Sequence, residues 1–293
     1  MNLRRGDIIN QYFNEKSSLQ DAVKTLRANI QFSSIDNELK TIVVTSVMPQ
    51  EGKSTLSIFL GIAMAEYGKK TLLVECDNRR PMIGNYLRRR AKTTVADIIS
   101  GRNATPLEAV EPTGMNRLDF LDSIVMANPV EVLSSRRFWA VIEELKSAYD
   151  IIIMDTPPLG SFIEAAVLAA KADGTLLVLK AGRTDANEAK KVIAQLEKAK
   201  ARLLGAVLND VDMSSESYYS DYYYSGGQRK KRRDGHKQPP RGARVPSGDD
   251  VPQSAPAKPR SAQPVPMRRI EHAVPKGRRP PDRKRETEDA TEA

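Results

Sequence analysis

Histidine is missing from most of the sequence, since both histidines, His236 and His272, lie near the C-terminal end. A Ser–His–Asp or Cys–His hydrolase and any histidine-ligated zinc site are therefore excluded from the chain before Gly226. The single cysteine, Cys76, cannot form an intramolecular disulfide, which agrees with a reducing cytosol. No run of about 18 apolar residues occurs, which excludes a membrane-spanning helix. We therefore expect a cytoplasmic protein.

The C-terminal segment 226–293 has the composition of a disordered tail. It holds 18 of the 46 basic residues, 9 of the 37 acidic ones and 11 of the 18 prolines, but no Leu, Phe, Trp or Tyr. Such a segment buries too little apolar surface to offset the entropy that is lost on ordering. The segment 1–225 carries the other 28 basic and 28 acidic groups. The whole net charge of +9 therefore belongs to the tail.

Residues 1–213 are predicted to form one α/β domain with a mostly parallel sheet and helices on both faces. Apolar, β-rich runs alternate with helical stretches, as expected of parallel strands that are buried on both sides. An amphipathic helix is predicted at 18–32. The predicted strands are Thr41–Thr45, Thr71–Cys76, Leu118–Leu121, Ile151–Met154, Thr175–Leu179 and Leu203–Leu208.

A phosphate-binding loop is predicted directly after the first strand, where Gly52-Lys53-Ser54 opens an apolar helix. Glycine lets backbone N–H groups approach the phosphates, the lysine reaches the β- and γ-phosphates, and the serine hydroxyl can bind Mg²⁺. The first glycine of the usual G-x-x-x-x-G-K-[ST] pattern is replaced by Val47. The residues expected to bind the nucleotide here are Pro49, Gln50, Glu51, Gly52, Lys53, Ser54 and Thr55.

Acidic residues stand at the ends of two further strands, as Glu75-Cys76-Asp77 and as Asp155. Ligands of open parallel sheets bind at the carboxyl ends of the strands. These carboxylates should therefore converge on the phosphate loop and hold a magnesium ion for phosphoryl transfer. The three strand ends together predict a site for ATP and Mg²⁺ in a fold like that of P-loop NTPases.

The three motifs resemble those of the bacterial tyrosine kinases, of the cytoplasmic type associated with capsule and exopolysaccharide synthesis. That family reads roughly T-S-x-x-P-G-E-G-K-[ST] in its Walker A motif, D-x-D-x-R-[RK]-P in Walker A′ and D-T-P-P in Walker B. Thr45–Ser54, Glu75–Pro81 and Asp155–Pro158 match these motifs in order and spacing. Asn128–Leu133 is similar to a further family stretch, P-N-P-x-E-L-L.

The sequence departs from the family pattern at three places. Gln50 replaces a glycine, which restricts the backbone of the loop, and Glu75 replaces the first aspartate of Walker A′. In the helix at 18–32, the family's E-x-x-R-x-x-R becomes Asp21-x-x-Lys24-x-x-Arg27. The change from arginine to lysine keeps the charge but loses a bidentate donor.

The resemblance implies a protein tyrosine autokinase that regulates capsular or exopolysaccharide synthesis and export. The implied catalytic residues are Lys53, Glu75, Asp77 and Asp155, where Lys53 binds the phosphates and Glu75 or Asp77 accepts the phenolic proton. Ser54, Asp77 and Asp155 are the implied Mg²⁺ ligands. Asn209 either contacts the base or is an ordinary turn residue after the last strand. Arg79 and Arg80 either steady phosphate charge or form an exposed, solvated pair.

The resemblance also implies partners. Self-association into a ring or dimer would use the helix at 18–32, with Asp21, Lys24 and Arg27 at the interface. A membrane activator of the polysaccharide co-polymerase type would recruit the kinase to the inner face of the cell membrane. The tail lies outside the resemblance, and its charge leaves two interpretations: the basic run 229–233 contacts anionic lipid, at roughly 1 kcal/mol per basic residue close to the surface, or it only makes the tail soluble.

Five of the nine tyrosines lie in the segment 214–225, namely Tyr218, Tyr219, Tyr222, Tyr223 and Tyr224. By composition alone, this segment is a low-complexity linker or an aromatic segment that stacks on RNA. Because it follows the kinase motifs directly, we predict that it is the phosphoacceptor segment and that a neighbouring copy phosphorylates it in trans.

Other functions remain open from the sequence. A dimerising ATPase switch, of the type that positions division or partition complexes, shares the sheet and the acidic strand ends. Its signature lysine is replaced here by Met48, and it leaves the tyrosines unexplained. A nucleotide-binding regulatory subunit without catalysis would account for Gln50 and Glu75. Nucleic-acid binding through the tail requires strongly salt-dependent affinity and is not expected.

Overall fold

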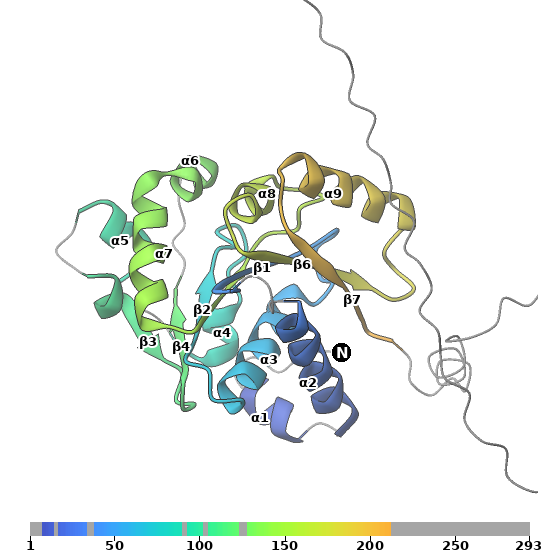
Figure 1. The fold of residues 1–293 in the computed structure, drawn as a ribbon, viewed down its shortest axis with the longest axis horizontal. Helices are drawn as coiled ribbons and strands as arrows, with labels where there is room; N and C mark the ends of the chain where they lie inside the picture. Colours follow the sequence, from blue (N-terminus) through green and yellow to red (C-terminus); the bar gives the residue numbers. More distant parts are fainter. Residues whose placement is uncertain are drawn as a thin grey trace, which may run out of the picture. The chain divides into compact units, whose positions relative to one another are not determined.

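A computed structural model describes residues 8–14, 17–33, 38–89, 93–101, 105–122 and 128–211. The tyrosine segment 214–225, the basic run 229–233 and the tail 226–293 lie outside these residues, so the expectations for them stay predictions. The described residues contain a seven-stranded sheet with helices on both sides (Figure 1).

The strand order in the sheet is β3-β4-β2-β5-β1-β6-β7. All neighbouring pairs are parallel except β3 and β4, which are antiparallel. The strands are β1 (Thr41–Ser46), β2 (Thr71–Glu75), β3 (Val110–Pro112), β4 (Leu118–Leu121), β5 (Ile151–Asp155), β6 (Gly174–Lys180) and β7 (Leu203–Asn209). The mostly parallel sheet and all six predicted strands are thus confirmed, while the short β3 was not predicted.

The helices cover the two faces of the sheet. They are α1 (Ile8–Asn14), α2 (Ser17–Phe32), α3 (Lys53–Glu66), α4 (Ile83–Leu87), α5 (Val95–Ile99), α6 (Pro129–Ser134), α7 (Arg136–Ala148), α8 (Glu164–Ala169) and α9 (Ala186–Lys198), with a 3₁₀ turn at Pro106–Ala109. Helices α1 and α2 precede β1, and the others lie between strands. In Figure 1, α1 to α3 lie on one side of the sheet and α7 to α9 lie on the other.

Two hydrophobic cores form because successive side chains of a strand point to opposite faces. On β1, Val43 packs in the core beneath α7, α8 and α9, whereas Ile42 and Val44 pack in the core with α1, α2 and α3. Both faces are therefore buried, as the continuous apolar runs indicate. At Gly61 of α3, an added Cβ would lie 3.0 Å from Leu73 of β2. This glycine therefore lets α3 pack closely on the sheet.

Helix α2 begins one residue before its predicted start and packs against α3 through Val23 and Ile30. Asp21 and Lys24 are exposed. Arg27 is half-buried, donates to Gln31 Oε1 at 2.6 Å, and lies 4.0 Å from the centre of the Tyr67 ring. In the part of the chain that the structure describes, no helix is long and apolar enough to cross a membrane.

Candidate functional site

The predicted phosphate loop lies between β1 and α3 and is held by the last strand. Gly52 has a φ of 94°, and a Cβ at this position would lie 2.1 Å from the side-chain nitrogen of Asn209. That nitrogen donates a hydrogen bond to the Glu51 carbonyl at 2.9 Å. Gly52 therefore leaves room for the Asn209 amide to brace the loop. Asn209 does not line the nucleotide cavity described below.

Glu51 supports the loop from inside. Its fully buried carboxylate accepts hydrogen bonds from the backbone N–H groups of Val47 and Met48, both at 2.8 Å, and from the Thr184 hydroxyl. Since these three donors occupy the carboxylate, the side chain does not face the phosphates. The Glu51 side chain therefore shapes the loop, and nucleotide binding at Glu51 stays a prediction for its backbone.

Gln50 adopts the left-handed conformation that glycine favours, with a φ of 65°. This conformation costs a non-glycine residue roughly 1–2 kcal/mol. The hydrogen bonds of Glu51 and Asn209 fix the loop around it. The chain therefore keeps a glycine-like loop shape despite the substitution, at a cost in strain.

The carboxylates at the strand ends converge on Lys53, as predicted. Lys53 Nζ lies 2.7 Å from Asp77 Oδ2 and 3.7 Å from Asp155 Oδ2, and all three side chains are at most 10% exposed. The strand order explains the convergence, because β5 lies between β1 and β2. The loop after β1 and the turn after β2 therefore both border Asp155 at the end of β5.

The electrostatics of this cluster follow from burial and close charges. Burial alone would lower the pKa of Lys53, but the charges of Asp155 and Asp77 outweigh it and raise that pKa. Burial raises the pKa of Asp155, against the opposing effect of Lys53. The lysine thus stays charged, and it supports two carboxylates that would otherwise be costly to bury.

The Glu75 carboxylate accepts hydrogen bonds from the backbone that follows it. The donors are the N–H groups of Met82 at 2.7 Å, Ile83 at 2.9 Å and Asp77 at 3.2 Å. Burial raises the pKa of Glu75 well above its usual range, and the charge of Asp155 adds to this rise. Glu75 therefore shapes the turn before α4 and does not line the nucleotide cavity, whereas Asp77 does.

The donor set fits a magnesium ion that arrives with a nucleotide. Asp155 Oδ2 is buried and has no hydrogen-bond partner among the described residues. Ser54 Oγ lies beside Lys53, 3.3 Å from its Nζ. Over the same residues, no group of three or more His, Cys, Asp or Glu forms a preformed metal site. Nucleotide-bound Mg²⁺ needs only one or two carboxylates, since phosphates and water supply the other oxygens.

A cavity of about 340 Å³ lies against this cluster. The phosphate loop forms one wall, the turn after β2 with α4 forms a second, and the loop after β5 forms a third. Its lining residues are Pro49, Gln50, Gly52, Lys53, Ser54, Thr55, Asp77, Arg79, Arg80, Met82, Tyr86, Pro158 and Phe162. The cavity thus combines phosphate-binding groups with an apolar and aromatic wall, which suits a phenol ring next to a triphosphate.

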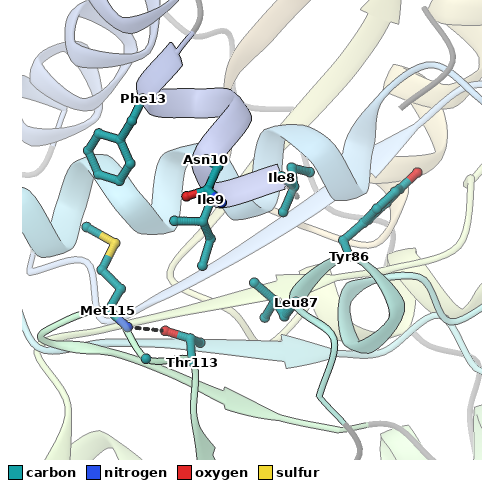
Figure 2. Close-up of a pocket in the computed structure, with 9 residues that line it drawn as sticks. Ile8, Ile9, Asn10, Phe13, Tyr86, Leu87, Thr113 and Met115 are labelled. Atoms are coloured by element: carbon teal, nitrogen blue, oxygen red, sulfur yellow. Dashed lines mark hydrogen bonds between the residues drawn. The ribbon is translucent and has the colours of Figure 1, made fainter. Parts of the chain in front are cut away.

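A second cavity, of about 370 Å³, lies between α1, α4 and the β3–β4 turn (Figure 2). It is lined by Ile8, Ile9, Asn10, Phe13, Tyr86, Leu87, Thr113, Gly114 and Met115. No lining residue is charged, so this cavity offers no cationic side chain to a phosphate group. Tyr86 borders both cavities, and Figure 2 shows its hydroxyl pointing away from the other labelled residues.

Sequence reasoning missed several residues of the site. The Ser57 hydroxyl lies 3.3 Å from Asp155 Oδ1, one helical turn after Lys53; the i, i+4 spacing could have placed it on the same face. Glu164, the first residue of α8, was also missed; it pairs with Arg79. For that pair and for Thr184, no local pattern in the sequence indicates the partner.

Known proteins resemble this chain over the region that contains the cavity. Residues 39–208 match the family model described as AAA domain. The tyrosine-protein kinase YwqD of Bacillus subtilis (strain 168) is 34% identical over 208 residues, which cover 71% of this chain and 87% of that protein. The tyrosine-protein kinase CpsD of Streptococcus agalactiae is 35% identical over 222 residues, covering 75% and 95%. The crystal structure of the chimerical protein CapA2B2 matches with a TM-score of 0.66 and 28% identity, covering 71% and 92%.

Proposed function

The chain belongs to the family of bacterial tyrosine-protein kinases, and we propose that it phosphorylates the tyrosines of segment 214–225 on neighbouring copies of itself. The main support for this proposal is the contact of Lys53 with Asp77 and Asp155 beside the phosphate loop. Family membership further supports a role in capsular or exopolysaccharide synthesis. In that role the kinase would act with a membrane activator at the inner face of the cell membrane.

The geometry supports a direct transfer from ATP to a tyrosine. The loop N–H groups and Lys53 bind the β- and γ-phosphates. The phenolic oxygen forms its bond to the γ-phosphorus while the bond from that phosphorus to the bridging oxygen breaks, and ADP leaves with the electron pair. Asp77, which lines the cavity, takes the phenolic proton. Mg²⁺, held by Ser54, Asp77 and Asp155, would supply positive charge to the transferring phosphates.

The two alternative functions are less well supported. Met48, in the position of the switch ATPases' lysine, is 44% exposed and apolar, so it offers no charge to a second nucleotide. The non-catalytic alternative depended on Gln50 and Glu75. Gln50 retains a glycine-like conformation and Glu75 supports the turn before α4. Asp77 and Asp155 still lie beside Lys53, which supports catalysis despite both departures.

The direct test is to incubate the dephosphorylated protein with ATP and Mg²⁺ and to map phosphotyrosine by mass spectrometry. We expect phosphate within residues 218–224, and none there in a variant with all five of those tyrosines changed to phenylalanine. Phosphate release without phosphotyrosine would support the switch ATPase instead. Nucleotide binding with neither product would support the regulatory subunit.

Self-association through α2 is part of the proposal. Asp21 and Lys24 are exposed on this helix and available to a neighbouring copy, whereas Arg27 already contacts Gln31 and Tyr67. We expect Lys24→Glu to lower the mass measured by light scattering under associating conditions. Lys190→Glu, on an exposed position of α9, is the matched control. Equal masses for the two variants would contradict an interface at α2.

A further inference from the structure

Arg79 occupies the wall of the cavity next to the carboxylate that contacts Lys53. Its backbone N–H donates to Asp77 Oδ1 at 3.2 Å, while Asp77 Oδ2 accepts from Lys53. Its side chain lines the cavity together with Lys53. A second positive charge therefore borders the place where the phosphates of ATP would lie.

Glu164 holds one edge of the Arg79 guanidinium by hydrogen bonds, and the Phe162 ring packs against one of its faces. Nε and Nη2 donate to Glu164 Oε1 at 3.0 and 2.8 Å, and the guanidinium carbon lies 4.1 Å from the centre of the Phe162 ring. Among the described residues, Nη1 has no hydrogen-bond partner. The arginine is thus held in one orientation and still has donors to offer.

Burying the Glu164 carboxylate to pair it with a half-exposed arginine costs desolvation free energy. The Glu164 side chain is 2% exposed, whereas the Arg79 side chain is 46% exposed. A buried carboxylate with one half-exposed partner adds little stability, because the desolvation of the acid offsets the attraction. The pair is better explained by orientation, since it ties the turn after β2 to the loop after β5 and fixes the guanidinium beside the cavity.

From these contacts we propose that Arg79 binds the γ-phosphoryl group of ATP and that Glu164 is the residue that positions it. The proposal rests on the kinase function proposed above and adds a residue to it. Planar guanidinium groups form strong, directional hydrogen bonds with phosphate oxygens. A donor fixed in advance stabilises the transferring group without reorganisation during the reaction. Phe162 adds a face that keeps the guanidinium plane in place.

The test compares the affinities for ATP and ADP by isothermal titration calorimetry in the presence of Mg²⁺. We expect Arg79→Met to weaken ATP binding about tenfold, in line with the loss of one charge-assisted hydrogen bond. ADP binding should change by less than about twofold, because ADP lacks the γ-phosphoryl group. Arg136→Met, at an exposed position on α7, should change neither affinity.

Glu164→Gln separates positioning from general structure. Glutamine keeps the shape and one acceptor oxygen, so we expect a selective weakening of ATP binding by about threefold, roughly half the free-energy change of Arg79→Met. In the Arg79→Met background the same change should have no further effect, because Glu164 then has nothing to position. The double variant also removes the buried, unpaired carboxylate, so it should unfold at a higher temperature than Arg79→Met alone.

Equal weakening of ATP and ADP binding, or additive effects of the two substitutions, would overturn the proposal and leave a structural ion pair. Unchanged affinities in both single variants would overturn it as well. The readout is independent of the proposed kinase activity. Selective loss of ATP binding without any phosphotyrosine in the wild type would retain the γ-phosphoryl contact and reject the kinase function.

Discussion

Lys53→Met is expected to reduce tyrosine phosphorylation by roughly a thousandfold or more. Lys53 is the cation that lies between Asp77 and Asp155, at 2.7 and 3.7 Å. Without it, the phosphates of ATP would meet two carboxylates with no compensating charge at that point. Removing one fixed donor to a developing charge costs about 10²–10³ in rate, and repulsion adds to this loss. Lys190→Met serves as the control for a lost surface charge.

The same variant can test transfer between copies. The kinase variant with the five tyrosines of 218–224 changed to phenylalanine is mixed with Lys53→Met, which retains the tyrosines. We expect phosphotyrosine on the Lys53→Met chains only in the mixture, measured by mass spectrometry. If both proteins alone and their mixture stay unphosphorylated while wild type is active, transfer occurs within one copy.

Lys53→Met should also change how stability depends on pH. Burial already raises the pKa of Asp155, and loss of the lysine raises it further. At pH values between the pKa of Asp155 in the unfolded chain and its raised pKa in the folded chain, the folded state binds more protons. The free energy of unfolding therefore falls as the pH rises through that interval. We therefore expect the melting temperature of Lys53→Met to fall below that of wild type mainly above about pH 4. An offset that is constant with pH would contradict this electrostatic explanation.

The second large effect is expected for Glu51→Ala. This change leaves the buried N–H group of Val47, the part-buried N–H group of Met48 and the part-buried Thr184 hydroxyl without their acceptor. Each unsatisfied buried group costs about 1–3 kcal/mol, so we expect the free energy of unfolding to fall by about 3 kcal/mol or more. Nucleotide affinity should fall with it, because the loop no longer holds its shape.

Glu51→Gln is the matched control for this prediction. The amide oxygen can accept both backbone N–H groups, and the amide nitrogen can donate to the Thr184 hydroxyl. We expect a loss below about 1.5 kcal/mol, as for a neutral hydrogen bond in place of a charged one. Urea unfolding and nucleotide titration measure both variants. If alanine and glutamine destabilise equally, the carboxylate acts through its charge rather than as a brace of the loop.

The core of the fold could be predicted because its strands leave a strong pattern. β1, β2 and β5 each contain an apolar run of three or four residues and are buried along their whole length. Their ends carry the chemistry, so the convergence of Lys53, Asp77 and Asp155 followed from the fold class. β3 was missed because three half-buried or exposed residues ending in Pro112 lack any period that distinguishes a strand from a loop.

The supports of the site could not be predicted, because they depend on contacts between distant segments. Asn209 reaches Glu51 across 158 residues of sequence, and Arg79 reaches Glu164 across 85. The spacing of residues in the sequence places a side chain on one face of a helix or strand. It does not show which residue of another helix or strand will contact that side chain. For the same reason, the sequence did not distinguish Glu75 from Asp77 as proton acceptor, and the structure places only Asp77 in the lining of the nucleotide cavity.

The hydrogen bond of Asn209 to Glu51 fixes the point from which the chain continues to the tyrosine segment 214–225. Tyr218 is the ninth residue after Asn209, and Tyr224 is the fifteenth. A chain spans at most about 3.3–3.6 Å per residue, so these tyrosines reach no farther than about 32 and 54 Å from Asn209. A neighbouring site between these two distances excludes Tyr218 but admits Tyr224. The spacing of copies in an assembly would then act as a ruler that selects which tyrosines are phosphorylated, from the far end of the segment inward.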